Sequence, residues 1–210
     1  MSPINILAMA SVKSINMIAI SDHNSIDNVK VAIDLGELLH ITVVPAIELQ
    51  TSEDIHFLCL FKKYQDLVDF YNTIKLQNVV NNEEIFGEQI VYDEDGIDVA
   101  HKQNLLLVAS NISSNKIKNI VDSFGGISIP AHIDRQSNSI KYILGEVDDE
   151  FRVVELSQEA NGSIINQYKD RLQLVNSDAH TLTNIGSAKG KIKLSKNTAE
   201  CLVEYLKNYE

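Results

Sequence analysis

The chain has 210 residues, of which 44% are hydrophobic and 22% are charged, and its formal net charge is −11 at pH 7. This composition is typical of a soluble globular protein, and we expect a single domain, 1–210, with a sizeable core. A broad nucleic-acid surface needs an excess of lysine and arginine, so the acidic balance argues against nucleic acid as a partner.

The sequence shows neither a membrane span nor a signal peptide, and it contains two cysteines. The apolar runs are too short to cross a membrane, and the first residues lack the basic start of a signal peptide. Cys59 and Cys201 lie in apolar patterns far apart in the sequence. We therefore expect a cytoplasmic protein with reduced cysteines, and a disulfide is the alternative.

The predicted elements alternate between strands and helices. The chain opens with a helix over 4–14, preceded by Ser2 as cap and Pro3 at the first helical position. In chain order there follow a strand (15–20), a helix (25–40), two strands (41–49 and 55–61), a helix (64–77), a hairpin (88–100), a helix (113–125), four strands (126–133, 152–157, 172–177 and 190–195) and a helix (196–209). This order predicts an α/β fold with a mostly parallel sheet, either open or closed into a barrel.

Acids and histidines follow the predicted strands. They are Asp22 with His23, Glu48, His132, and Asp178 with His180. In parallel α/β folds the loops after several strands converge at one end of the sheet, so we expect these side chains to lie together.

His56 is the exception, because it begins its predicted strand instead of following it. The connection from Glu48 to His56 is only "LQTSEDI", which is too short for the crossover that a parallel pair requires. The strand that starts near His56 should therefore run antiparallel to the strand that ends at Glu48. His56 would then lie at the same end of the sheet as Glu48.

Neutral imidazoles and carboxylates together form sites for zinc, manganese or iron. Such ions polarise a phosphoryl oxygen and generate hydroxide near neutral pH. Each histidine alone is also compatible with a structural role, and each aspartate with a helix cap. It is the gathering of several of them at one predicted face that favours a metal site.

Other catalytic arrangements are not supported by the sequence. It has no G-x-S-x-G motif and no glycine-rich phosphate loop, and neither cysteine has an evident activating partner. Arg135, just after "PAHID", either contacts a substrate phosphate or forms an exposed salt bridge.

The segments "IAISDHNS", "PAIEL", "IHFLCLF", "IPAHID" and "NSDAH", in this order, resemble the polymerase-and-histidinol-phosphatase (PHP) superfamily. The resemblance covers essentially the whole chain. It implies a distorted (β/α)7 TIM-like barrel, a site with up to three divalent metal ions, and phosphoesterase activity.

The resemblance also implies roles for individual residues. His23, Asp178 and His180 would serve one metal site, and Glu48 would bridge two ions. His56 and His132 would complete the second site. Asp22 would contact one of the metal ligands and orient it, and Arg135 would contact the substrate.

One feature of the superfamily is missing from this sequence. Members begin with a strand that bears a His-x-His pair, whereas this chain starts at the helix that follows that strand. We expect an N-terminally truncated domain, most simply through assignment of the start to an internal methionine, with a shortened chain or a decayed gene as alternatives. Fewer than three ions would then bind.

Two functions remain open at this point. The first is a metal-dependent phosphoesterase that hydrolyses a phosphorylated small molecule or nucleotide, with doubtful activity in a chain without the first strand. The second is a degenerate, non-catalytic domain for metal binding or interaction. A DNA exonuclease is a weaker third option, given the acidity.

Overall fold

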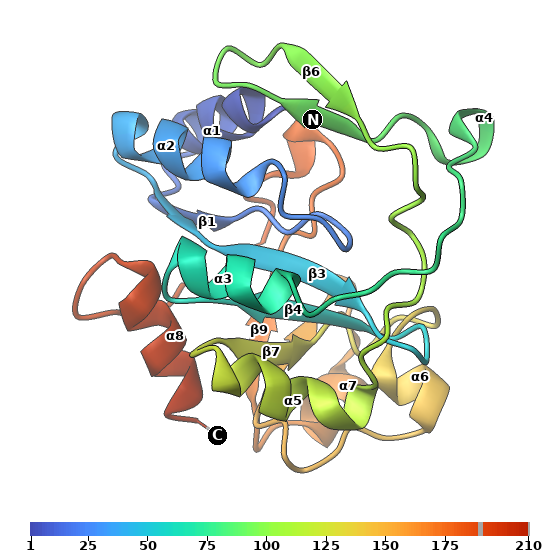
Figure 1. Ribbon diagram of the computed structural model, residues 1–210. Helices are drawn as coiled ribbons and strands as arrows, with labels where there is room; N and C mark the ends of the chain where they lie inside the picture. Colours follow the sequence, from blue (N-terminus) through green and yellow to red (C-terminus); the bar gives the residue numbers. More distant parts are fainter. Residues whose placement is uncertain (189–190, 210) are drawn as a thin grey trace.

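A computed structural model describes residues 1–188 and 191–209 of the chain (Figure 1). Its helices are α1 (Pro3–Val12), α2 (Val29–Leu39), α3 (Tyr64–Tyr71), α4 (Glu83–Phe86), α5 (Ser114–Ser123), α6 (Ile140–Leu144), α7 (Gly162–Gln167) and α8 (Ala199–Lys207), with a 3₁₀ turn η1 (Leu182–Asn184). Its strands are β1 (Met17–Ala19), β2 (Thr42–Val44), β3 (Ala46–Gln50), β4 (His56–Leu60), β5 (Ile90–Tyr92), β6 (Asp98–His101), β7 (Ile127–Pro130), β8 (Val153–Leu156) and β9 (Leu172–Val175).

The described strands form separate hydrogen-bonded sheets and not the mostly parallel sheet that was expected, and together with the helices they confirm a mixed α/β architecture. Two pairs are parallel, β1 with β2 and β8 with β9, whereas β3, β4 and β7 form an antiparallel sheet and β5 and β6 a hairpin. Within residues 1–188 and 191–209 these pairings do not close a ring of strands. No described helix is both long and apolar enough to cross a membrane.

Two predicted strands differ from the structure. The segment 41–49 is divided at Pro45 into β2, which pairs with β1, and β3, which pairs with β4. Proline has no N–H to donate within a sheet, so the ladder changes partner there. Residues 191–195 form no strand and are mostly exposed, while Gly190 lies outside the described residues. A strand there would have had no buried face to stabilise it.

The antiparallel pairing of β3 and β4, predicted from the short connection between them, is confirmed. The register places Gln50 opposite His56 and Glu48 opposite Leu58. A tight turn closes the hairpin, in which the N–H of Thr51 donates to the carbonyl of Ile55 at 2.8 Å.

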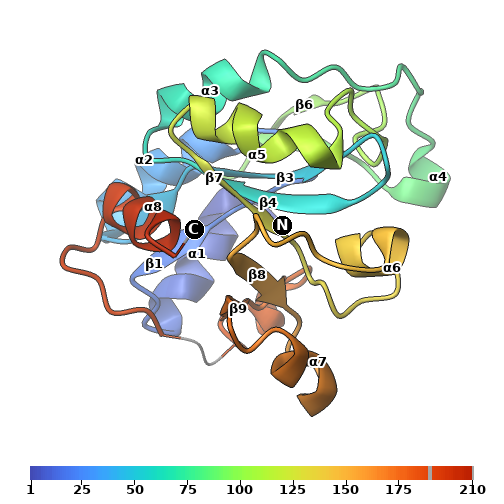
Figure 2. The same cartoon turned by 90° about the horizontal axis from the view of Figure 1, so that it is seen from below.

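The sheet of β3, β4 and β7 has a hydrophobic cluster on each face. On one face Phe57 and Cys59 pack with residues of α3 and α5, which lie together on one side of the sheet in Figure 2. On the other face Leu58 and Leu60 pack with residues of α8. Because side chains alternate along a strand, Glu48 and His56 belong to the same face as Leu58.

The segment between α3 and α5 leaves the sheet and carries α4 and the β5–β6 hairpin, which lies above α1 and α2 in Figure 1. The turn of the hairpin rests on the start of α1. A Cβ atom on Gly96 would lie 2.7 Å from Cγ2 of Ile4, and the φ of Gly96 is +78°. Glycine is therefore required at this turn.

Candidate metal centre

The Glu48 carboxylate lies at the centre of three imidazoles. Its Oε2 is 3.3 Å from Nδ1 of His23, while its Oε1 is 3.4 Å from Nδ1 of His56 and 3.3 Å from Nε2 of His132. Only 13% of the Glu48 side chain is exposed. The four side chains form one compact cluster, which we call the Glu48 cluster.

Three different elements bring the histidines to Glu48. His56 is the diagonal neighbour of Glu48 across the β3–β4 pair, where side chains on one face are within reach of each other. His132 lies two residues after β7 and has a left-handed backbone (φ +31°). His23 follows β1, and its backbone forms a parallel bridge to Glu48.

The cluster shifts the pKa values of its members in different directions. Burial raises the pKa of Glu48, but the His132 and His56 imidazoles lower it more. The pKa of this carboxyl is therefore far below its usual range, and the group stays ionised even in acid. Burial lowers the pKa of His132, yet the Glu48 carboxylate raises it further, to above its ordinary value. Burial dominates at His23 and lowers its pKa. Glu48 is therefore a permanent anion, and His23 is a neutral imidazole near pH 7.

This donor set fits a divalent metal ion. His23, Glu48 and His56 each offer one ligand atom, and these atoms lie within 4.8 Å of one another. Nδ1 of His132 is buried and has no hydrogen-bond partner among the described residues, and Nδ1 of His23, although 3.3 Å from Glu48, is not in hydrogen-bond geometry with it. Buried polar atoms rarely lack a partner, and imidazole with carboxylate suits zinc, manganese or iron.

Metal binding to the Glu48 cluster is expected to weaken as the pH falls. The raised pKa of His132 means that a proton competes with the ion, and affinity should fall about tenfold per pH unit below that pKa. Titration calorimetry with Zn²⁺ between about pH 6 and pH 8 measures this dependence. An affinity that does not change over this range would show that His132 is not a ligand.

Asp178 and His180 follow β9 and lie beside the Glu48 cluster without joining it. The Asp178 carboxylate forms an ion pair with Arg135, whose Nη1 is 2.7 Å from Oδ2. The His180 side chain is 71% exposed, and its Nδ1 lies 2.9 Å from the carbonyl oxygen of Asp178. Both groups are close enough to influence the charge of His23. Arg135 thus forms the salt bridge that was the alternative to a substrate contact.

Asp22 is hydrogen-bonded to Asn28. Its Oδ2 accepts from Nδ2 of Asn28 at 3.2 Å, and burial raises the pKa of the carboxyl. The Asn28 side chain also donates to the carbonyl of Ile90 and accepts from the N–H of Tyr92. Asp22 and Asn28 therefore connect the site to the β5–β6 hairpin.

Asn24 has a supporting role that the sequence reasoning missed. It is fully buried with a left-handed backbone (φ +49°). Its Nδ2 donates to the carbonyls of Leu106 (2.7 Å) and Val108 (2.9 Å), and its Oδ1 accepts from the N–H of Gln50 at 3.0 Å. Asn24 thus joins the loop of His23 to β3 and to the chain before α5. Its place directly after His23 was the only signal in the sequence.

Glu155, on β8, is a second residue that was missed. It is 7% exposed, and burial raises the pKa of its carboxyl. The signal was present in the sequence, since this is the one charged residue in the apolar strand "VVEL". A buried acid is rare unless it has partners.

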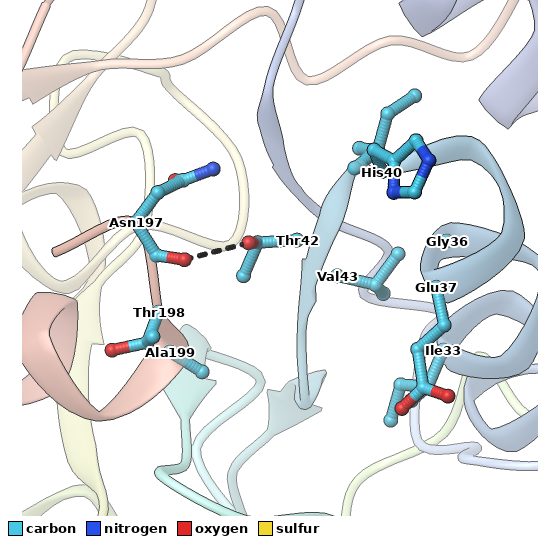
Figure 3. Close-up of a pocket in the computed structure, with 10 residues that line it drawn as sticks. Ile33, Gly36, Glu37, His40, Thr42, Val43, Asn197, Thr198 and Ala199 are labelled. Carbon is cyan, nitrogen blue, oxygen red and sulfur yellow. Dashed lines mark hydrogen bonds between the residues drawn. The ribbon is translucent and has the colours of Figure 1, made fainter.

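A pocket elsewhere in the molecule is separate from this centre. It lies where α2 ends, β2 begins and α8 begins, and its lining includes His40, Thr42 and Asn197 (Figure 3). Thr42 starts β2, whereas His23 lies beyond the end of its parallel neighbour β1, so the pocket is at the opposite end of this pair of strands. The titratable residues that line the pocket are Glu37 and His40.

Three solved structures share the fold. Endonuclease Q from Pyrococcus furiosus, a lesion-specific endonuclease, has a TM-score of 0.69 and 15% identity over 99% of this chain and 51% of its own. Endonuclease Q in complex with a 27-mer duplex carrying an abasic lesion has a TM-score of 0.63 and 15% identity, covering 97% and 51%. A protein classed as a metal-dependent phosphoesterase, from Bifidobacterium adolescentis, has a TM-score of 0.58 and 13% identity, covering 99% and 91%.

This chain therefore spans about half the length of Endonuclease Q and most of the length of the phosphoesterase. No protein-family model and no curated protein matches the sequence. What these likenesses show is the fold, a mixed α/β architecture of the kind found in both proteins.

The expectation that nucleic acid is an unlikely partner is wrong. Endonuclease Q, which shares this fold over 51% of its length, has been solved with a 27-mer duplex substrate whose abasic lesion lies at the active site, so the net charge of −11 does not exclude such a partner for the present chain. Net charge describes the whole surface, whereas a phosphate backbone is bound by the local field of a site. Metal ions are often the largest local charges in such a site.

Proposed function

We propose that this chain is a metal-dependent phosphoesterase domain of the PHP type, with its strands arranged as a distorted barrel and its site in the Glu48 cluster. The observation that supports this most is the division of the Glu48 carboxylate, with His23 at one oxygen and His56 and His132 at the other. A carboxylate that bridges two ions needs this division.

The residues of the Glu48 cluster would hold two ions. His56, His132 and one oxygen of Glu48 would hold one ion. His23 and the other oxygen would hold a second, together with Asp178 and His180. A metal ion, when bound, supplies Lewis acidity and a hydroxide nucleophile near neutral pH. Glu48 is ionised and His23 is neutral before any ion arrives, so the ligands need little change of protonation there.

Arg135 would bind the phosphoryl group. Its guanidinium is 41% exposed and now neutralises Asp178. A cation held by Asp178 would replace that partner and leave the guanidinium able to form paired hydrogen bonds to phosphate oxygens. Asp22 would support the loop of His23 through Asn28.

The substrate we propose is a phosphate ester of a small molecule or nucleotide. A DNA phosphodiester at a lesion is the second candidate, supported by the likeness to Endonuclease Q in complex with an abasic duplex. Since this chain covers 51% of that protein, the activity of the whole of Endonuclease Q is only a guide.

The proposal is tested with the full chain, loaded with Mn²⁺ or Zn²⁺ and given para-nitrophenyl phosphate, nucleoside monophosphates and a duplex with one abasic site. We expect metal-dependent hydrolysis, and a fall in kcat/KM of at least about 100-fold for His132→Ala. The matched control is His40→Ala, because His40 ends α2 at the opposite end of the pair of strands β1 and β2. Metal binding without hydrolysis of any substrate would instead favour a non-catalytic metal-binding domain.

A further inference from the structure

Glu155 joins two loops that bear proposed metal ligands. Its Oε2 accepts a hydrogen bond from the backbone N–H of His132 at 3.1 Å, and its Oε1 accepts one from Nδ2 of Asn176 at 2.6 Å. Its backbone carbonyl accepts a third from the N–H of Ile133 at 2.9 Å. One residue of β8 is therefore bonded both to the chain after β7 and to the chain after β9.

Both loops have backbone that needs support. His132 and Asp178 have φ values of +31° and +41°, in a region that side chains other than glycine rarely adopt. Such conformations persist only where surrounding contacts hold them. Glu155 holds His132 directly, and it holds Asn176, which lies two residues before Asp178.

We propose that Glu155 is a positioning residue that sets the relative placement of His132 and Asp178 for metal binding. This inference rests on the proposed function, in which His132 and Asp178 hold neighbouring metal ions and must therefore be placed relative to each other. The carboxylate does not serve as a ligand, since each of its oxygens accepts a hydrogen bond from the protein and the residue is 7% exposed. Hydrogen-bond partners behind metal ligands commonly change metal affinity by about 10- to 100-fold.

The test compares two substitutions of similar volume. Glu155→Met removes both acceptors and leaves the N–H of His132 without its partner. Glu155→Gln keeps one oxygen for that N–H, and its amide group donates to Asn176 once the Asn176 amide turns over. We expect affinity for Zn²⁺ alone, measured by titration calorimetry on the full chain, to fall at least about tenfold in Glu155→Met and by less than about threefold in Glu155→Gln.

The outcomes separate the possible roles. If Glu155 were a ligand, loss of its charge in Glu155→Gln would lower affinity as much as Glu155→Met does, and the inference would be overturned. If it were a purely structural anchor, the melting temperature of Glu155→Met would fall while its Zn²⁺ affinity stayed at the wild-type value, which would also overturn it. Glu159→Met, at an exposed position of the next loop, is the matched control.

A second variant covers the case in which Glu155→Met does not fold. Asn176→Ala removes only the bond on the β9 side, and we expect a smaller loss of Zn²⁺ affinity in the same direction. Wild-type affinity in Asn176→Ala would contradict the link between the two loops. Zn²⁺ binding without hydrolysis of any phosphate ester would contradict the proposed function and leave the role of Glu155 standing.

Discussion

Replacing Glu48 with glutamine is expected to lower the affinity for Zn²⁺ or Mn²⁺ by at least about 100-fold, more than the loss of a supporting partner causes. Glutamine has nearly the same shape, but it brings no negative charge to the three imidazoles. One of its terminal atoms is also an NH₂ group, which cannot coordinate a metal ion. Glu48 has a histidine at each of its oxygens, so either orientation of the amide places this NH₂ group next to at least one histidine.

Elemental analysis after loading and removal of excess metal, together with titration calorimetry, measures this loss. Glu88→Gln is the matched control, since Glu88 is exposed on the segment between α3 and α5. Circular dichroism establishes that both variants are folded. Full metal content in folded Glu48→Gln would show that the ion binds elsewhere, and the assignment of the metal centre would be abandoned.

Replacing Asn24 with alanine is expected to destabilise the protein by about 3–5 kcal/mol, because three backbone groups, two buried and one part-buried, lose their hydrogen-bond partner. Alanine is also strained at the left-handed backbone of this position, where φ is +49°. For a chain of this size the melting temperature should fall on the order of 10 °C.

Thermal unfolding followed by circular dichroism measures the effect in the metal-free protein. Asn119→Ala is the control, because Asn119 is exposed on α5 and alanine is the better helix former. A fall of only a degree or two in Asn24→Ala would mean that water replaces the lost partners. The chain before α5 would then be held to the site by other contacts.

Local sequence patterns were sufficient to predict the strands that carry Glu48 and His56. Strand pairing of β3 with β4 followed from the length of one connection, since a parallel crossover cannot be built from so few residues. The meeting of His56 with Glu48 followed in turn from the alternation of side chains along paired strands. These predictions depended on properties of the backbone, which act within a few residues.

Other predictions from local patterns did not agree with the structure. The apolar alternation in 190–195 indicated a strand, yet residues 191–195 form none, because a strand needs a neighbouring edge as well as a pattern. Small helices such as α6 and α7 were not predicted, since a few residues show too little periodicity to indicate a helix.

The sequence by itself determined which chemistry is available, an α/β chain with acids and histidines after its strands. Only the tertiary structure decided which of these residues meet. It gathered His23, His56 and His132 around Glu48, and it paired Asp178 with Arg135. It also placed Asn24 and Glu155 behind the ligands, where they bond to groups as many as 84 residues away. Hydrogen bonds of this kind depend on the path of the whole chain, and so no local pattern contains them.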